Sequence, residues 1–431
     1  MLGGGIAGTG FARRMLSLAA SREAPVKITL ISRPSCNYCG GLITNLSLDT
    51  LRRIYDFEVP EDVVVSQIDE VVLVNRSGSA SVCLESPLAS VFRTSRFGQL
   101  GFDDSFRTSI LSDLPTSAGE MLSVVEPAVA TAVELPGEGR QGKVTYSHQS
   151  GTETLEADLI VIATGLRSIR GKLVTCLSGA TGYRPPPTMP ACVTEIDSSA
   201  CGTSRVGRRL LILSGIVRGA VVAVIPKHRD WLTVAALGKV LTVEDLEQMF
   251  AHPAVREHVE LDDVEAGLVC KNVCASGVYT GPAANFYGDG WVVVGDLTGH
   301  GRLLKDGYFA ALLGANLAAH TCFEHGWSRQ AFARHYHGGL RGFGLENLMA
   351  MELFGLNSFM SRYKAYDRVM MSAFTREGRP HVYGGLAHSA FRALSTGELP
   401  YPKIVLLFAA GMASWALKHP GRALAAALRK E

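Results

Sequence analysis

The chain has 431 residues, of which 47% are hydrophobic and 19% charged, so it is a globular and rather apolar protein whose length favours two domains. Its 42 basic and 40 acidic residues nearly cancel, which argues against a nucleic-acid partner. Nine cysteines, an odd number behind no recognisable secretory leader, argue against a disulfide framework and favour a cytoplasmic location.

A glycine-rich loop opens the chain, with Gly3, Gly5 and Gly8 at the spacing GxGxxG before a predicted helix over Thr9–Ala20. In a dinucleotide-binding fold the first glycine makes a tight turn, the second lets the backbone approach a pyrophosphate, and the third allows close helix packing. The N–H groups at the start of the helix favour anionic phosphates. Only two residues precede the loop, where a strand of about five is usual. The sequence therefore predicts either a stub in place of the first strand or a start assigned too far downstream.

Apolar and alternating runs predict the elements that follow the loop. Short apolar runs between turn residues are typical of buried strands, and longer runs with a 3.6-residue period are typical of helices. They predict strands at Val26–Ile31, Val63–Val74 and Met121–Thr131, a helix at Phe106–Leu114, a hairpin at Val144–Gln149 and Thr152–Glu156, and the strongest strand at Ala157–Ala163. The small residues Thr164 and Gly165 follow that strand.

The stretch Pro185–Cys201, rich in proline and serine, marks a break into a second region. Beyond it the patterns predict strands at Arg209–Leu213, Val221–Ile225, Trp231–Leu237 and Trp291–Val294, and a helix at Val243–Met249 that Thr242 caps. Gly295 and Asp296 follow the last strand. A long helix starts at about Tyr308, and the chain is helical from Gln330 onward.

The C-terminal run Ile404–Leu417 has fourteen mostly apolar residues, fewer than the roughly twenty needed to span a bilayer. Lys403 precedes the run, and Arg422, Arg429 and Lys430 follow it. This pattern predicts a helix that lies on the inner face of the membrane, and packing into the protein core is the alternative.

Three strand ends carry the chemistry: Gly3–Gly8, Thr164-Gly165 and Gly295-Asp296. In open α/β sheets, ligands bind at the carboxyl ends of the strands. In this order and spacing, the three motifs resemble the flavoprotein fold of the hydroxybenzoate-hydroxylase type. The resemblance implies an α/β fold with one three-layer, Rossmann-like FAD-binding domain built on a parallel sheet. There Thr164 and Gly165 cover the central part of FAD, and Asp296 reaches its ribityl chain.

The same resemblance divides the chain into interleaved parts. The FAD-binding domain takes residues 1–65, 101–185 and 281–325, a mixed-sheet substrate domain takes 66–100 and 186–280, and a helical region takes 326–431. Because the chain has a single GxGxxG motif, no separate nicotinamide domain is expected. The electrons then have to come from an external donor, NAD(P)H or ferredoxin.

Within this fold group, Pro34–Leu42 is similar to a Pro-Cys-Gly-Gly stretch of the geranylgeranyl reductases, which saturate isolated C=C bonds of prenyl chains. Ile225-Pro226-Lys227 is similar to a substrate-domain stretch of that family that ends in Phe-Pro-Lys. The likeness implies hydride transfer from flavin N5 to a prenyl or other lipid-like alkene in a dry, apolar pocket. It places Gly40 and Gly41 near the flavin ring, with Cys39 or Tyr38 as proton donor.

The chain also departs from the family pattern. The second strand ends in Ser32-Arg33 where an acidic residue usually binds the adenosine ribose, so that contact is weaker or supplied elsewhere. After Asp296, the stretch Leu297–Arg302 replaces the usual proline and Gly-x-Gly turn. The helix that follows is expected to aim its N-terminus at the flavin pyrimidine or the pyrophosphate, with cofactor contacts from Arg302, Lys305 and Gly307.

The cysteines and histidines allow other interpretations. Cys36 and Cys39 have the spacing of a redox dithiol, and together with Cys270 and Cys274 they offer four thiolates for zinc or a cluster. Neither is preferred, and no metal site is predicted. His300 follows Asp296 closely, but a histidine that caps a helix or faces solvent is the preferred interpretation.

Three other functions stay open beside alkene reduction, because function does not follow from fold. The first is an FAD-dependent monooxygenase, and the second is a quinone-linked dehydrogenase at the membrane surface. The third is a degenerate flavoprotein that acts only as a binding partner.

Overall fold

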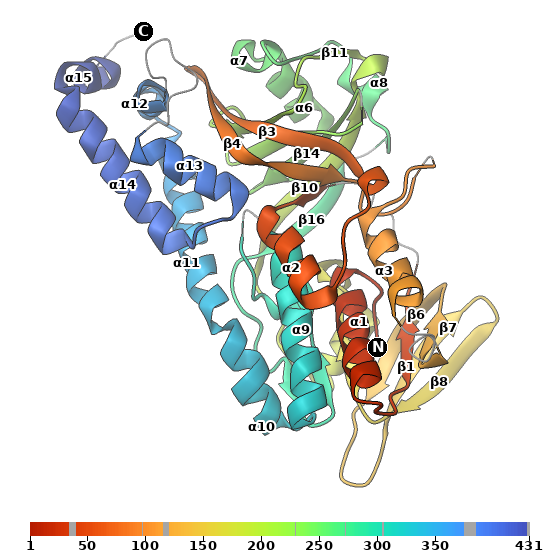
Figure 1. The fold of residues 1–431 in the computed structure, drawn as a ribbon. Coiled ribbons are helices and arrows are strands. Elements are labelled where there is room, and N and C mark those ends of the chain that lie inside the picture. Colours follow the sequence, from red (N-terminus) through yellow and green to blue (C-terminus); the bar gives the residue numbers. More distant parts are fainter. Residues whose placement is uncertain are drawn as a thin grey trace.

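The computed structural model describes residues 1–33, 40–96, 98–114, 120–228, 230–271, 273–303, 306–374 and 385–428. In Figure 1 a parallel sheet flanked by helices fills the lower half of the molecule, and an eight-stranded sheet crosses the upper half. The last helices run along one flank.

The parallel sheet is built around the first residues of the chain. β1 (Ile28–Ile31) pairs in parallel with β5 (Leu122–Val125), and β9 (Ile160–Ile162) pairs in parallel with β18 (Trp291–Val293). β17 (Tyr287–Gly288) adds an antiparallel edge to β18. Leu2 lies between the two pairs, where it bridges Ile31 and Ile162 in parallel. Met1 and Leu2 thus take the central place of the sheet, as a stub.

Helices cover this sheet. They are α1 (Ile6–Ser21), α2 (Asn45–Tyr55), α3 (Phe102–Asp113), α5 (Lys172–Thr181) and α9 (Gly307–His325). Small residues let α1 and α9 pack closely, since a Cβ on Gly10 would lie 3.4 Å from that of Ala315. An antiparallel sheet of β6 (Ala128–Glu134), β7 (Gly142–His148) and β8 (Gly151–Ala157) lies beside the parallel sheet. The hairpin predicted at Val144–Glu156 is confirmed.

The single strand predicted at Met121–Thr131 is wrong. The segment forms two strands, β5 and β6, in two different sheets. Glu126 and Pro127 separate them, and Pro127 has no N–H with which to continue a ladder. This break leaves Glu126 directly after the carboxyl end of β5.

The eight-stranded sheet is mixed, as the sequence resemblance implies. Its order is β16-β10-β14-β13-β12-β3-β4-β2, in which β12 is parallel to β3 and the other pairs are antiparallel. The strands are β2 (Gly41–Ile43), β3 (Val64–Asn75), β4 (Gly78–Val91), β10 (Thr188–Asp197), β12 (Arg209–Ser214), β13 (Val221–Pro226), β14 (Trp231–Leu237) and β16 (Cys274–Tyr279). A small unit on one face holds β11 (Gly202–Ser204), α6 (Val243–Ala251), α7 (Pro253–Arg256), β15 (Val259–Leu261) and α8 (Val264–Gly267).

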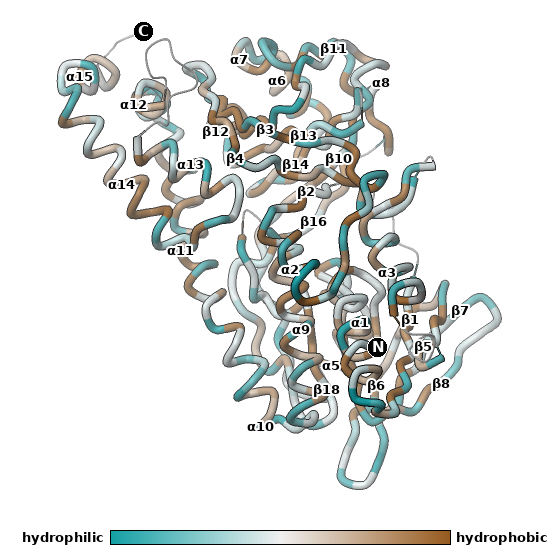
Figure 2. Tube along the Cα trace, viewed as in Figure 1, coloured by the Kyte–Doolittle hydropathy of each residue, from teal (hydrophilic) through white to brown (hydrophobic). Residues whose placement is uncertain are grey.

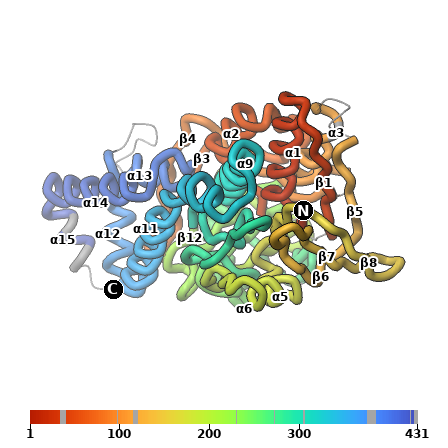
Figure 3. Tube along the Cα trace, turned by 90° about the horizontal axis from the view of Figure 1, so that it is seen from below, coloured from red at the N-terminus to blue at the C-terminus, as the bar shows by residue number. Residues whose placement is uncertain are grey.

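The C-terminal part is helical, as predicted. It contains α10 (Arg329–Ala331), a π-helical stretch Phe332–His337, α11 (Gly338–Met360), α12 (Lys364–Phe374), α13 (Leu386–Thr396), α14 (Tyr401–Lys418) and α15 (Pro420–Leu428). Met371, Phe374 and Phe391 of α12 and α13 pack against the strands β3 and β4. Seen from below in Figure 3, α12–α15 extend away from the end that carries β8. None of the helices in the described ranges combines the length and the apolar character needed to cross a bilayer.

Candidate functional site

A cavity of about 860 Å³ lies where the two sheets meet. Its walls include the first glycine loop, the turn after β9 and the turn after β18, represented by Gly3, Gly5, Thr164, Gly165 and Asp296. The structure therefore brings together the three strand ends that the sequence singles out. The eight-stranded sheet contributes the opposite wall through Gly40, Val193, Ser276 and Gly277.

The glycine loop has the geometry that its spacing predicts. Gly3 has φ +108°, and a Cβ there would lie 2.3 Å from the Ala163 carbonyl oxygen. A Cβ on Gly8 would lie 2.0 Å from the Gly3 carbonyl oxygen, so both positions exclude any side chain. Gly5 differs, because a Cβ there would meet nothing within 4 Å and would enter the cavity. Gly5 is the N-cap of α1, so free N–H groups of that helix face the same space.

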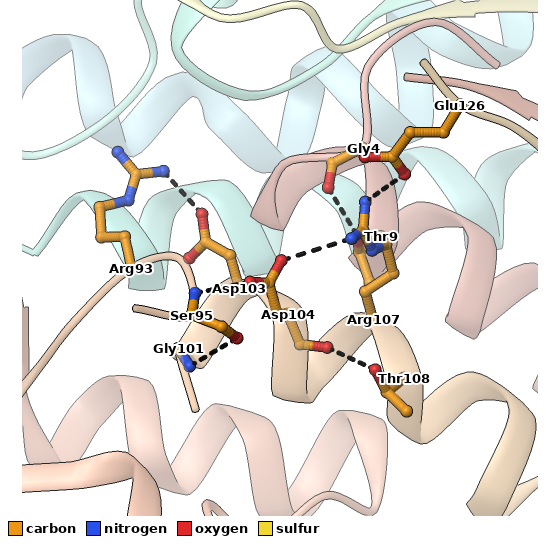
Figure 4. A network of polar contacts seen from close by, with 10 residues as sticks. All are labelled: Gly4, Thr9, Arg93, Ser95, Gly101, Asp103, Asp104, Arg107, Thr108 and Glu126. Carbon is orange, nitrogen blue, oxygen red and sulfur yellow. Dashed lines mark hydrogen bonds and ion pairs between the residues drawn. The ribbon is translucent and has the colours of Figure 1, made fainter. Parts of the chain in front are cut away.

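An arginine network forms the wall beside this loop (Figure 4). Arg107 of α3 donates to Glu126 Oε2 at 2.8 Å and to Asp104 Oδ1 at 3.3 Å. A Cβ on Gly4 would lie 3.7 Å from Arg107 Nη1, so the guanidinium lies next to the glycine loop. Sequence reasoning missed Arg107. The one feature of the sequence that could have pointed to Arg107 is that it is the only basic residue of α3.

A second arginine lies at the end of the cavity that holds Asp296. Arg93 Nη2 donates to Asp103 Oδ2 at 2.9 Å, and both residues line the cavity. Burial raises the pKa of Asp103, and the Arg93 charge opposes that rise. The surrounding protein also raises the pKa of Asp296, although its side chain opens onto the cavity, and Arg93 again opposes the rise. Neither arginine belongs to a sequence motif.

The strand end that lacks the usual acidic residue also lines the cavity, through Ser32 and Arg33. The Ser32 side chain is buried against the glycine loop, since a Cβ on Gly4 would lie 2.6 Å from its Oγ. The carboxylate at this end comes instead from Glu126, after the neighbouring strand β5. Sequence analysis did not find Glu126, because it placed that residue inside a strand.

Not every predicted cofactor residue reaches the cavity. Arg302 is buried, where it pairs with Glu346 at 3.2 Å and donates to the carbonyl oxygens of Gly397 and Leu399. It therefore ties the turn after β18 to the C-terminal helices. Gly8, Gly41, Gly295 and Gly307 are not among the residues that line the cavity. Cys39, Tyr38 and Lys305 lie outside the described residues.

Asp306 connects the start of α9 to the start of α2. Asp306 is the N-cap of α9, and Asp306 Oδ1 accepts hydrogen bonds from Thr44 Oγ1 at 2.9 Å and from Ser47 Oγ at 2.5 Å. Thr44 is in turn the N-cap of α2. The Asp306 side chain makes no capping hydrogen bond to α9, so its carboxylate links the start of α9 to the first turn of α2.

The interpretation of His300 as exposed or capping is wrong. Its ring is buried against Phe286, and its Nδ1 lies 2.9 Å from the Thr298 carbonyl oxygen. Burial lowers the pKa of His300 to about 4, so this histidine is a neutral core residue.

The cysteine interpretations stay predictions, because both depend on Cys36 and Cys39. Cys274 lines the cavity, but no three potential metal ligands cluster within the residues that the structure describes. Cys36 and Cys39 lie outside those residues.

Neither a family model nor a curated protein matches this sequence. Solved structures do match the fold. A geranylgeranyl bacteriochlorophyll reductase-like protein from Thermoplasma acidophilum has a TM-score of 0.65 at 13% identity, over 95% of this chain and 98% of that one. The p-nitrophenol 4-monooxygenase of Pseudomonas putida has a TM-score of 0.56 at 13% identity, over 98% and 97%. A halogenase in complex with FAD has a TM-score of 0.58 at 12% identity, over 100% and 92%.

These likenesses extend over nearly the whole chain. The chain therefore has the fold of the hydroxybenzoate-hydroxylase-type flavoproteins, as its three sequence motifs imply.

Proposed function

We propose that this chain binds FAD in the cavity and is an FAD-dependent oxidoreductase. The observation that carries the proposal is the open space at Gly5, beside the free N–H groups of α1 and the Arg107 guanidinium. Backbone N–H groups and an arginine are the donors that a diphosphate requires. Asp296 at the other end offers an acceptor for the hydroxyl groups of a ribityl chain.

The adenosine end of the cavity fits FAD if Glu126 takes the role of the acidic residue that usually follows the second strand. An acidic residue usually accepts hydrogen bonds from the ribose, and Ser32-Arg33 cannot do this as a carboxylate does. Glu126, at the end of the adjacent strand, is a carboxylate that lines the same wall. We therefore assign ribose recognition to Glu126, which forms an ion pair with Arg107.

The finer proposal is reduction of C=C bonds in a prenyl or other lipid-like substrate. Bound FAD, reduced by NAD(P)H or ferredoxin, would supply the hydride. The chain's own residues would shield the reacting carbons from water, through Val193 and Gly277 on the far wall. The other carbon needs a proton, for which Cys39 and Tyr38 remain the proposed donors, directly before the cavity residue Gly40.

Monooxygenation is the second candidate, because a monooxygenase is among the structures that share this fold. The two candidates differ in the fate of oxygen. A reductase adds two hydrogens to the substrate and consumes no oxygen, whereas a monooxygenase consumes oxygen and hydroxylates its substrate.

We expect purified protein to take up added FAD with a Kd below about 1 µM. The chemically reduced complex should then saturate double bonds of a geranylgeranyl lipid without oxygen. Absorbance titration and mass spectrometry of the lipid measure the two steps. Oxygen uptake with a hydroxylated product would replace the reductase proposal by monooxygenation. A chain that takes up no FAD would favour the role of a binding partner.

We further propose that α14 contacts the surface of an anionic membrane. Leu406 and Leu417 lie on its outward face with 69% and 82% of their surfaces exposed, and apolar residues recur along this helix in Figure 2. Residues 401–428 hold no Asp or Glu, while Lys403, Lys418 and Arg422 stand at the ends of α14 and in α15. An apolar face flanked by cations matches the headgroup region of anionic lipids.

The paired substitution Leu406→Glu with Leu417→Glu is expected to weaken binding to phosphatidylglycerol-containing vesicles at least about tenfold, because two large apolar side chains leave the interface. Co-sedimentation measures the effect. Val240→Glu serves as control, since Val240 is an exposed apolar residue outside α14. Equal sedimentation of all three proteins would contradict this contact. A wild-type dimer that the paired substitution dissociates would assign the face to a second copy instead.

A further inference from the structure

A buried polar cluster lies inside the eight-stranded sheet. Glu195 of β10, Thr233 of β14 and Lys227 after β13 expose 0%, 0% and 3% of their surfaces. Burying a carboxyl group and an ammonium group is costly unless they are paired and hydrogen-bonded. Apolar residues of similar size would often serve stability as well. The cluster therefore calls for a role beyond holding the sheet together.

The contacts of the cluster bring distant strands of the sheet together. Thr233 is the direct cross-strand partner of Glu195, and its Oγ1 donates to Glu195 Oε1 at 2.7 Å. Lys227 Nζ donates to the carbonyl oxygens of Gly41, at 3.3 Å, and of Val91. In sheet order β13 is separated from β4 by two strands, so the sheet curls until Lys227 reaches the far edge.

At that edge, Lys227 contacts one pair of residues that lie opposite each other on neighbouring strands. Gly41 of β2 and Val91 of β4 are direct partners, and Lys227 donates to the carbonyl oxygens of both. A Cβ on Gly41 would lie 2.4 Å from the Val91 carbonyl oxygen, so only glycine fits there. The ammonium group thus fixes the first residue of β2, next to Gly40.

The cluster stands directly behind the cavity wall. Gly40 and Val193 both line the cavity, and a Cβ on Gly40 would lie 3.7 Å from the Val193 side chain. Glu195 follows Val193 by two residues in β10, so the two side chains point to the same face of the sheet. Through Gly41, Lys227 holds the strand that continues this wall.

The pKa of Glu195 lies near neutral pH. Burial raises its pKa to about 7, while Lys227, Thr233, Arg96 and the Gly40 N–H favour the charged form and limit the rise. Glu195 Oε2 has no hydrogen-bond partner within the described part of the chain. A carboxylate attracts Lys227 and the Gly40 N–H more strongly than a carboxylic acid does.

We propose that Glu195 and Lys227 are positioning residues that hold the Gly40–Gly41 backbone as one wall of the cavity, and that ionised Glu195 holds it more firmly than protonated Glu195. The inference rests on the proposed function only in that FAD is one of its probes. It adds to that function a group that orders the backbone directly after Tyr38 and Cys39.

The first test uses the FAD-free protein. Removing only Lys227 would leave Glu195 buried without its cation, so the paired substitution Lys227→Met with Glu195→Gln is the better variant. Amide exchange in residues 41–43 and 88–91 is expected to speed up at least about tenfold, as measured by mass spectrometry. Glu260→Gln is the control, because the Glu260 side chain in β15 is 41% exposed, and it should leave exchange in residues 41–43 and 88–91 unchanged.

The second test separates the two residues. The single substitution Lys227→Arg keeps a cation, so amide exchange in residues 41–43 and 88–91 is expected to stay as slow as in the wild type. Glu195→Gln keeps the shape and should remove any difference in corrected exchange between pH 6 and pH 8, whereas the wild-type wall should exchange more slowly at pH 8. Wild-type exchange rates in the folded paired variant, or the same pH response in Glu195→Gln, would overturn the inference.

The third test uses FAD. The paired variant should bind FAD at least about tenfold more weakly than the Glu260→Gln control, because a less ordered Gly40–Gly41 wall has to be ordered on binding. If the wild-type chain binds no FAD, the proposed function fails while the exchange measurements still decide this inference. Unaltered FAD affinity beside faster exchange would show that the wall is not part of the binding site and would also overturn the inference.

Discussion

Gly5→Val is expected to abolish FAD binding while the fold stays intact. A Cβ at Gly5 meets no atom of the protein within 4 Å, and the backbone there is extended, with φ −75° and ψ −177°, so valine fits without strain. The added side chain enters the space between the α1 N–H groups and Arg107, where the diphosphate of FAD would lie. We expect affinity for FAD to fall at least about a hundredfold, or roughly 2.7 kcal/mol.

The structure offers a closely matched control for this substitution. Gly385 is also a helix N-cap with an extended backbone, φ −57° and ψ −178°, and a Cβ there also meets nothing within 4 Å. Gly385→Val should therefore leave FAD affinity unchanged. FAD titration of both variants, with the thermal midpoint of each as a check on folding, gives the answer. If Gly5→Val binds FAD like the wild type, the cavity does not hold the diphosphate where we place it.

Arg13→Met is expected to lower the free energy of unfolding by about 3 kcal/mol, through loss of a buried hydrogen-bond centre. Arg13 of α1 is 1% exposed and donates to the carbonyl oxygens of Tyr55 at 2.9 Å and Ser109 at 2.8 Å. It also donates to the Asp56 carbonyl oxygen and to Asp113 Oδ2. Methionine fills part of the volume but leaves buried carbonyl groups without a donor.

Urea denaturation measures this loss, and Arg22→Met is the control. Arg22 is the C-cap residue of the same helix and pairs with Glu324 at 2.9 Å, but its side chain is 61% exposed. Exposed pairs contribute about 1 kcal/mol at most. A similar, small loss in both variants would mean that the buried contacts of Arg13 with the end of α2 and with α3 do not stabilise the fold.

Local pattern was enough to predict the parts of the site that lie at strand ends. The GxGxxG spacing of Gly3, Gly5 and Gly8 carries its own physical requirement, because a Cβ at Gly3 or Gly8 would overlap a backbone carbonyl oxygen. The turns at Gly165 and Gly295 follow apolar strands for the same kind of reason, and both have positive φ. Such features depend on a few neighbouring residues, so a single sequence reveals them.

Side chains that act across the fold could not be predicted in this way. Arg107 and Arg93 come from segments without a motif, and only the packing of α3 and of the chain after β4 brings them to the glycine loop and to Asp296. The prediction for Arg302 shows the converse. Arg302 follows β18, as the sequence indicates, yet its contacts with Glu346 and two carbonyl groups direct its side chain toward the C-terminal helices.

By itself, the sequence determined the dinucleotide-type glycine loop and the helical C-terminal part, while the α/β fold with a mixed sheet was implied by its resemblance to a flavoprotein fold. The glycine loop and the helices follow from glycine sterics and from periodicity, which act over short stretches of chain. The tertiary structure alone decided that Met1 and Leu2 fill the central strand position, that Glu126 lines the cavity with Ser32 and Arg33, and that Lys227 reaches the Gly41 carbonyl oxygen near the buried Glu195. Those contacts join residues far apart in the chain, and their cost or benefit depends on burial that exists only once the sheets have curled and packed.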